Sequence, residues 1–221
     1  ETDFYGIGKT RTKALESGTS VYAPRAVRRI QVGQARRRLT VTVMVQAARP
    51  AYIYLIDESQ AAWMKHRNGI KHIAQLQAGL RYWATQEGLE ALSALCDLEE
   101  AFPSMPRWAV KRIKIHVGFS QGWVNACDAL NQNIRVYFIV DGKLYRGHDM
   151  HSGMIQGCTI STVDLPLVLE IFIWHVSLQL ERAQLSYRFF QFADDIATNS
   201  AVHKDTGINR FRAVAVVLRE G

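Results

Sequence analysis

The stretch Tyr187-Arg188-Phe189-Phe190-Gln191-Phe192-Ala193-Asp194-Asp195-Ile196 decides the fold of this chain. An aromatic and apolar run leads into two adjacent aspartates, and a second apolar run begins at Ile196. This pattern predicts a β-hairpin with two carboxylates at its tip. Like charges repel, and an isolated Asp-Asp pair is most often a solvated turn. The buried approach to the pair favours a different interpretation, a rigid platform for a metal ion.

A third aspartate ends another apolar run upstream. Leu92-Ser93-Ala94-Leu95-Cys96-Asp97 is typical of a short strand that ends in an acid, and Phe102 follows it. If this strand lies beside the hairpin, we expect Asp97 to face Asp194. The carboxylates would then hold two Mg²⁺ ions about 3.5–4 Å apart, with Mn²⁺ as the alternative ion. Mg²⁺ suits such a site because it takes carboxylate and phosphate oxygens and retains several waters.

Periodicity elsewhere predicts a mixture of strands and helices. We expect strands over 39–45, 136–140 and 143–148, with an Asp141-Gly142 turn between the last two. We expect helices over 61–82, over 107–117 and from 161 or 162 onward, and a loop or extended arm over 1–24. The order strand, helix, hairpin, helix, hairpin predicts an α+β fold, in which an antiparallel sheet carries its helices on one face.

The composition is that of a globular protein with a basic surplus. Of 221 residues, 48% are hydrophobic, and 27 Lys and Arg stand against 20 Asp and Glu, a formal charge of +7. Such a surplus favours a polyanion such as nucleic acid, or an anionic membrane surface. The basic residues gather in one stretch: Arg25, Arg28, Arg29, Arg36, Arg37 and Arg38. Two interpretations stay open there, a solvated basic arm and a phosphate-binding segment.

The cysteines and the apolar runs bear on compartment. Cys96, Cys127 and Cys158 lie far apart, without a C-x-x-C pair, which argues against a zinc knuckle or a disulfide framework and predicts a reducing, intracellular location. The N-terminus lacks the apolar core of a secretory signal. The run 165–180 contains Glu170 and is shorter than a membrane span, so we expect a buried helix and no membrane span.

Three motifs together resemble the reverse transcriptases. Asp97-Leu98-Glu99-Glu100-Ala101-Phe102 resembles their D-x-x-x-A-F motif A. Gly153-Met154-Ile155-Gln156-Gly157-Cys158-Thr159-Ile160-Ser161 resembles G-x-x-Q-G-x-x-x-S motif B, and Phe192-Ala193-Asp194-Asp195 matches the F-A-D-D form of motif C. Gln60-Ala61-Ala62-Trp63 with Arg67 is similar to a weakened fingers signature, Q-x-G-F-R-x-x-R. The resemblance covers roughly residues 58–200 and is nearest to enzymes of the non-LTR retrotransposon and group II intron type.

The resemblance implies a fold and an activity. It implies a right-hand polymerase palm with partial fingers, and RNA-directed DNA polymerisation from an RNA template, a DNA primer and dNTPs. It divides the chain into a basic N-terminal arm with partial fingers (1–57), a fingers and palm core (58–200) and a truncated C-terminal segment without a thumb (201–221).

The resemblance also implies roles for single residues. Asp97 and Asp194 would be the bridging metal ligands, with Asp195 assisting at the same site. Phe102 would lie under the incoming sugar and exclude a 2′-hydroxyl. The remaining assignments are Gln156 and Gly157, which would line the nucleotide and template pocket, and Arg67, which would contact the triphosphate.

Departures from the family pattern leave a second hypothesis open. Pro103 stands where the family often has Asp, and Ala62-Trp63 replaces the Gly-Phe of the fingers signature. The chain would then be an inactive descendant of a reverse transcriptase that serves as a structural or binding subunit and has protein partners. The clustered carboxylates favour the catalytic interpretation, because a drifting scaffold has no physical reason to retain them.

Overall fold

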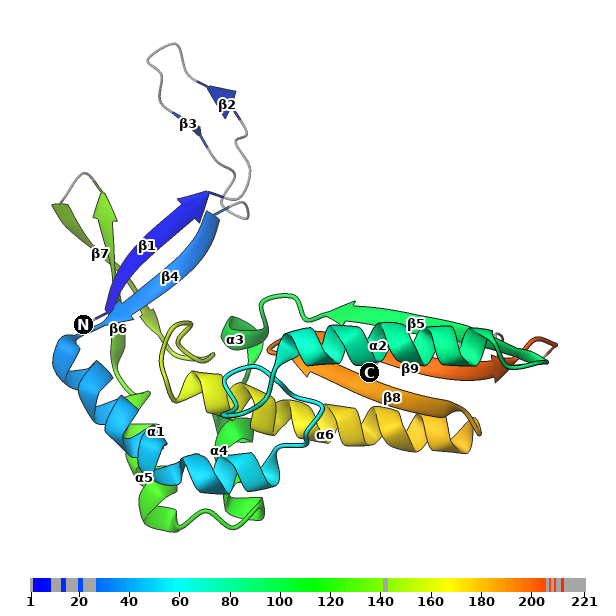
Figure 1. Ribbon diagram of the computed structural model, residues 1–221. Helices are drawn as coiled ribbons and strands as arrows, with labels where there is room; N and C mark the ends of the chain where they lie inside the picture. Colours follow the sequence, from blue (N-terminus) through cyan, green and yellow to red (C-terminus); the bar gives the residue numbers. More distant parts are fainter. Residues whose placement is uncertain are drawn as a thin grey trace. The chain divides into compact units, whose positions relative to one another are not determined.

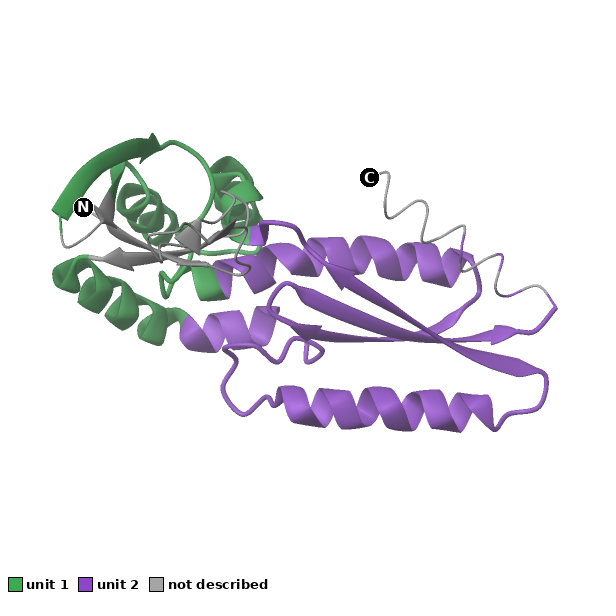
Figure 2. Ribbon diagram, turned by 90° about the horizontal axis from the view of Figure 1, so that it is seen from above, with its two compact units in different colours: residues 1–48, 102–162 green, residues 49–101, 163–221 purple. Residues whose placement is uncertain are grey.

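The computed structural model describes residues 2–8, 13–14, 20–21, 27–140, 143–205, 207, 209 and 212. The chain forms two compact units (Figure 2). Unit 1 comprises residues 1–48 and 102–162, and unit 2 comprises residues 49–101 and 163–221. The units therefore interleave along the chain. The ranges 1–57, 58–200 and 201–221 implied by the resemblance stay a prediction.

Unit 2 is built on a three-stranded antiparallel sheet (Figure 1). Its strands are β5 (Leu89–Asp97), β8 (Ser186–Phe192) and β9 (Asp195–His203), in the order β5-β9-β8. Both strands expected around the aspartates are thus confirmed, and they share a sheet. The helices of this unit are α2 (Gly69–Ala84) and most of α6 (Ser161–Arg182). The predicted helix over 61–82 begins only at Gly69, where the Asn68 side chain accepts a hydrogen bond from the Ile70 N–H and caps it.

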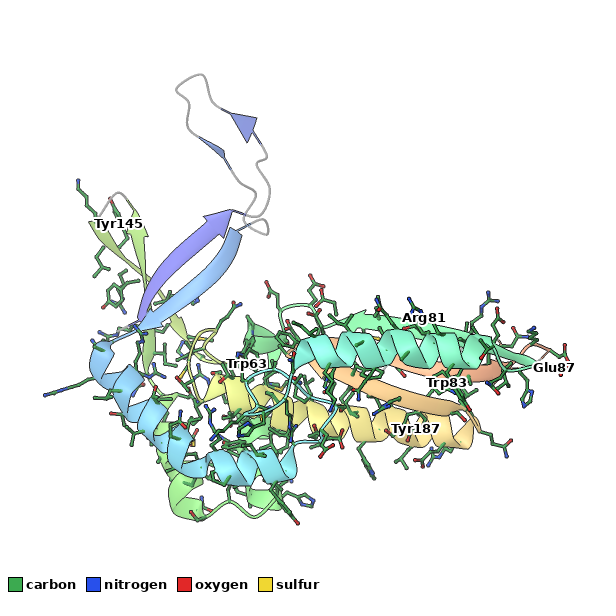
Figure 3. All side chains as sticks on the ribbon, in the orientation of Figure 1. Trp63, Arg81, Trp83, Glu87, Tyr145 and Tyr187 are labelled. Atoms are coloured by element: carbon green, nitrogen blue, oxygen red, sulfur yellow. The ribbon has the colours of Figure 1, made fainter. Side chains whose placement is uncertain are left out.

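The two helices lie on opposite faces of this sheet (Figure 2). On one face, Val176 and Leu180 of α6 pack with Val202 of β9. On the same side, the Tyr187 hydroxyl donates to Glu181 of α6 at 2.9 Å (Figure 3). On the other face, Asn199 of β9 donates to the Leu76 carbonyl of α2 at 2.8 Å. The expectation of helices on one face was wrong. Neighbouring residues of each strand point to opposite faces of the sheet. Both faces here carry apolar side chains, so each face packs against a helix that shields it from water.

Unit 1 contains a four-stranded sheet in the order β4-β1-β6-β7. Its strands are β1 (Thr2–Gly8), β4 (Val27–Gly33), β6 (Ile134–Val140) and β7 (Lys143–Met150). A separate pair joins β2 (Lys13–Ala14) to β3 (Ser20–Val21). The expected hairpin is confirmed by the antiparallel pairing of β6 with β7, although Asp141-Gly142 lies outside the described residues. Within the loop or extended arm expected over 1–24, Thr2–Gly8 is extended and forms β1, which pairs with both β4 and β6.

Three short helices lie wholly or mostly in unit 1. They are α3 (Ala101–Ser104), α4 (Arg107–His116) and α5 (Gln121–Leu130). The helix α4 confirms the prediction over 107–117, whereas α5 was not predicted. A Ser120 side-chain cap, which accepts a hydrogen bond from the Trp123 N–H, marks the start of α5.

The helix α1 (Ala35–Leu55) replaces the strand predicted over 39–45. Alternation of Thr and Val suggested a strand, but the side chains that are buried, Val41 and Val45, lie four positions apart, and Val43 between them is 61% exposed. That spacing is helical, because residues i and i+4 share a helix face while i and i+2 do not. The helix also continues through Pro50.

The helix α6 is long and apolar enough to cross a membrane by length and composition alone. Half of its most apolar window is buried inside the structure, where Val176 and Leu180 pack against the sheet of unit 2. A core helix of a folded domain passes the same test of length and hydropathy. The packing therefore agrees with the buried helix that was expected here.

Candidate active site

A two-residue loop places the adjacent aspartates at the end of the unit 2 sheet. Phe192 of β8 pairs with Asp195 of β9, so Ala193 and Asp194 form the loop between the strands. Ala193 has a φ of 60°, which is uncommon for a residue with a side chain. A positive φ at the first loop position is the pattern of a type II′ hairpin, which matches the twist of the flanking strands. The hairpin predicted from the sequence is thereby confirmed.

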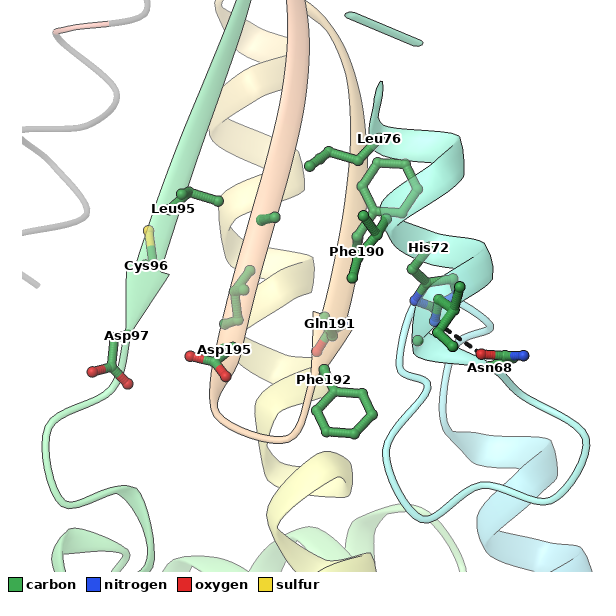
Figure 4. A pocket seen from close by; sticks show the side chains of 15 residues that line it. Asn68, His72, Leu76, Leu95, Cys96, Asp97, Phe190, Gln191, Phe192 and Asp195 are labelled. Atoms are coloured by element: carbon green, nitrogen blue, oxygen red, sulfur yellow. Dashed lines mark hydrogen bonds between the residues drawn. The ribbon is translucent and has the colours of Figure 1, made fainter. Parts of the chain in front are cut away.

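Asp97 lies directly across from Asp195. The β5–β9 register pairs these two residues at the end of both strands. The expectation that Asp97 faces Asp194 was therefore wrong, since Asp194 occupies the loop and β9 begins one residue later. Residues directly opposite on antiparallel strands point to the same face, about 4.5–5.5 Å apart at Cβ. The strands thus bring two carboxylates together on one face of the sheet (Figure 4).

Electrostatics at this pair favour a cation. The pKa of Asp195 is raised, first by partial burial and then by the negative charges of Asp194 and Asp97. Like charges directly opposite in a sheet destabilise it, and a cation bound between them removes that repulsion. Carboxylate oxygens are the donors that Mg²⁺ and Mn²⁺ prefer, so the donor set fits such an ion. Within the described part of the chain, no three His, Cys, Asp or Glu side chains form a metal-binding group.

Gln60 holds the backbone of the aspartate loop. Its side chain is fully buried, and its Nε2 donates to the Ala193 carbonyl at 3.1 Å. Its Oε1 accepts from the Ala193 N–H at 3.0 Å and from the Ala62 N–H at 2.9 Å. The sequence drew attention to Gln60 within the fingers signature but gave it no role. A buried glutamine has no signal in periodicity that would reveal its backbone partner, 133 positions away.

Arg67 lies near Gln60 and is engaged with the backbone. Its two terminal nitrogens donate to the carbonyls of Asp57, Gln60, Ile53 and Ile56. These contacts hold the end of α1 against the segment that carries Gln60. The structure thus gives Arg67 a structural role in unit 2, while the triphosphate contact implied by the resemblance stays a prediction.

A cavity of about 630 Å³ lies beside the carboxylate pair (Figure 4). It is lined by side chains from α2 and from all three strands, and Asp97 and Asp195 lie at its border. Several apolar side chains that line it are exposed, namely Ile70, Ile73, Leu95 and Phe192. On its α2 side, His72 meets Phe190 edge-on with ring centroids 5.8 Å apart. The pKa of His72 is lowered, chiefly by burial, which favours the neutral imidazole.

The other residues implied by the resemblance lie in unit 1. Phe102 is buried in α3, and its carbonyl accepts from the Met154 N–H at 2.7 Å. Gly153 has a φ of +78°, and a Cβ there would lie 2.3 Å from the Pro103 carbonyl oxygen. These contacts join the motif A turn to the loop that carries Gln156 and Gly157. Gly157 has a φ of +93°, a backbone conformation that glycine adopts more readily than other residues.

Comparisons with known proteins bear on the fold alone. No protein-family model and no curated protein matches the sequence. Among solved structures, an RNA-dependent RNA polymerase of BmCPV at its elongation state has a TM-score of 0.58 at 13% identity, covering 98% of this chain and 19% of that one. Telomerase from Candida albicans, in complex with a fragment of telomeric RNA, has a TM-score of 0.53 at 10% identity. It covers 82% of this chain and 31% of that one.

A truncated apo telomerase from Candida tropicalis has a TM-score of 0.51 at 12% identity, covering 81% of this chain and 36% of that one. The chain is similar in fold to nucleic-acid polymerases. It spans between about a fifth and a third of the length of these polymerases. At such low identity the likeness concerns the fold, and function has to be argued from the site.

Proposed function

We propose that this chain is the core of an RNA-directed DNA polymerase that acts by a two-metal mechanism. The observation that carries the proposal is the pairing of Asp97 with Asp195 across β5 and β9, beside Asp194. Paired carboxylates at the exposed end of a sheet suit divalent ions that bind phosphates. The polymerase-like fold and the basic surplus of the chain support the same function.

The carboxylates have a defined part in this mechanism. Asp97 and Asp195 would hold the ions, and Asp194 lies in the adjacent loop. Ions held there would supply activation of the primer 3′-hydroxyl and stabilisation of the leaving pyrophosphate. The protein contributes position and charge, because phosphoryl transfer of this kind needs little covalent chemistry from side chains. Rigid placement of the aspartate loop is therefore the property on which turnover depends most.

The substrates follow from the resemblance rather than from the comparisons. We propose an RNA template, a DNA primer and dNTPs, with Phe102 as the side chain that excludes a 2′-hydroxyl. Gln156 and Gly157 are proposed to line the nucleotide and template pocket, and Arg67 to contact the triphosphate. A telomerase and an RNA-dependent RNA polymerase both resemble the chain in fold, so the choice of nucleotide is left to experiment.

A second function, that of an inactive structural subunit, is favoured by one observation. Among the described residues, no cluster of three metal-binding side chains forms around the aspartates. Under this alternative the apolar cavity beside Asp97 and Asp195 would be a contact surface in a larger assembly. The two functions differ in whether the carboxylates are needed for nucleotide transfer.

Primer extension separates these two functions. The assay extends a DNA primer on an RNA template with Mg²⁺ or Mn²⁺, supplied with dNTPs or with rNTPs, at low salt where basic proteins bind nucleic acid best. We expect extension with dNTPs by the wild-type chain, and a loss of at least roughly 100-fold in Asp97→Asn and in Asp195→Asn, because each variant removes a ligand of the catalytic ions.

Glu90→Gln is the matched control for primer extension. It removes an exposed carboxylate near the other end of β5 and is expected to leave extension unchanged. Equal extension by the wild type and both aspartate variants would contradict the proposed mechanism. Absence of extension in every protein would favour the structural subunit, and a preference for rNTPs would contradict the assignment of DNA synthesis.

A further inference from the structure

We propose that Gln60 is a positioning residue that holds the Ala193-Asp194 loop in the conformation that pairs Asp195 with Asp97. This inference rests on the proposed function, because it assigns a new role within the same metal site. It concerns a residue that lies outside the carboxylate cluster and acts through the backbone of Ala193.

The first observation is the fit of the glutamine to the loop. A side-chain amide has one donor and one acceptor group, and Gln60 uses both on a single residue. Its Nε2 donates to the Ala193 carbonyl and its Oε1 accepts from the Ala193 N–H. Two hydrogen bonds to one residue fix that residue's orientation as well as its position. The Gln60 side chain is fully buried, so water cannot readily take the place of these hydrogen bonds when they are lost.

The second observation is the conformation that the glutamine holds. Ala193 has a φ of 60°, a left-handed backbone conformation that is unfavourable for a residue with a Cβ. Glycine is the usual residue at this position of a two-residue loop. A strained residue persists only where its surroundings determine its conformation. The hydrogen bonds between the Gln60 side chain and the N–H and carbonyl of Ala193 hold that residue in this conformation.

The third observation is the anchoring of Gln60 itself. The segment around it runs beside the end of β8, where the Gln191 N–H donates to the Ser59 carbonyl at 2.7 Å and the Ala61 N–H donates to the Gln191 carbonyl at 2.9 Å. Arg67 donates to the Gln60 carbonyl at 3.1 Å. The glutamine is thus attached to the strand that delivers the loop. Relaxation of Ala193 would rotate Asp194 and shift the start of β9, where Asp195 meets Asp97.

The test measures metal affinity and backbone protection rather than activity. Mn²⁺ binding is followed by electron paramagnetic resonance in the wild type, Gln60→Met and Gln60→Glu. The methionine variant keeps the length of the side chain and removes its hydrogen bonds. The glutamate variant keeps an acceptor for the Ala193 N–H and can donate to the Ala193 carbonyl only when its carboxyl is protonated. We expect Mn²⁺ affinity to fall roughly 10- to 100-fold in Gln60→Met, as for other residues that orient metal ligands, and less in Gln60→Glu.

Asn199→Leu is the matched control for stability. It removes another buried amide from the same sheet, at 1% exposure, whose side chain bonds to α2 rather than to the aspartate loop. Its Mn²⁺ affinity is expected to stay within about twofold of the wild type, since unrelated sites act independently. Hydrogen exchange is measured on the same proteins, and we expect the Ala193 amide to lose protection in Gln60→Met alone.

The outcomes separate the inference from the proposed function. Equal Mn²⁺ affinity in the wild type and Gln60→Met, with the wild type binding the ion, overturns the role of Gln60 and leaves the proposed function intact. A wild type that does not bind Mn²⁺ overturns the proposed function and, with it, the role of Gln60. An equal loss of affinity in Asn199→Leu shows a general loss of stability and also overturns the inference.

Discussion

At the scale of single residues, like charges lie close together at the proposed metal site. Asp97 and Asp195 are like charges in direct cross-strand register, and the pKa of Asp195 is raised by burial and by its charged neighbours. Stability alone would select against this arrangement. A second isolated case is Glu170 of α6, where burial raises the pKa of the carboxyl to about 7. Both cases show acids that lack full compensation within the folded protein.

Glu170 makes the stability of the protein depend on pH. Its Oε1 lacks a hydrogen-bond partner. The negative charge of Asp57 also raises the pKa, whereas a backbone hydrogen bond at Asp57 and the charge of Arg67 lower it without cancelling the effect of burial. Because the pKa of this acid is higher in the folded state, the folded state binds the proton more tightly. Stability from this group is therefore highest below the ordinary pKa of 4.5 and falls as pH rises to about 7.

The variant Glu170→Gln tests this pH dependence by urea unfolding at pH 4.5 and pH 8. We expect the variant to be more stable than the wild type at pH 8, by about 2 kcal/mol, because it removes a poorly solvated charge. At pH 4.5 the advantage is expected to be smaller, because the wild-type carboxyl is then largely protonated in the folded state. The same advantage at both pH values would contradict the assigned ionisation.

At the scale of elements, the sequence predicted the strands around the aspartates better than the first helix. The runs that end at Asp97 and at Ala193 are rich in apolar residues, and both form strands of one sheet. The stretch 39–45 alternates like a strand and is helical, because contacts of Val41 and Val45 with the rest of the chain override the local β-branched preference. Local pattern does not contain those tertiary contacts.

Two substitutions in α1 distinguish helix from strand. In a helix Val45 is buried and Val43 is exposed, whereas a strand would place both on one face. We expect Val45→Asp to lower the free energy of unfolding by roughly 3 kcal/mol or more, because it buries a charge without a partner. Val43→Asp is expected to change it by less than about 1 kcal/mol. Equal effects in chemical denaturation would contradict the helix.

The parts of the candidate site that lie in local sequence motifs could be predicted, and the contacts between distant segments could not. The sequence identified Asp97, Asp194 and Asp195, but it paired Asp97 with the wrong aspartate, because strand register depends on a loop length that composition does not give. It could not assign Gln60, whose partner is a backbone group far along the chain. Phe102, Gln156 and Gly157 lie in unit 1, so their roles toward the carboxylates stay predictions.

At the scale of the whole molecule, the carboxylate pair, its aspartate loop and Gln60 all belong to unit 2. The proposed metal binding would therefore depend on contacts that the unit makes within itself. The chain spans only part of the polymerases that it resembles in fold. Cation binding can be measured on this chain by itself.

The most direct measurement is a double-mutant cycle of Mn²⁺ binding by electron paramagnetic resonance, with wild type, Asp97→Asn, Asp195→Asn and the double variant. We expect each single variant to bind Mn²⁺ at least roughly tenfold more weakly and the double variant to lose little more, because the two carboxylates share an ion. Without metal, the variants are expected to be at least as stable as the wild type, since a like-charge pair is removed. A wild type that binds Mn²⁺ no more tightly than the double variant would contradict a shared cation between Asp97 and Asp195.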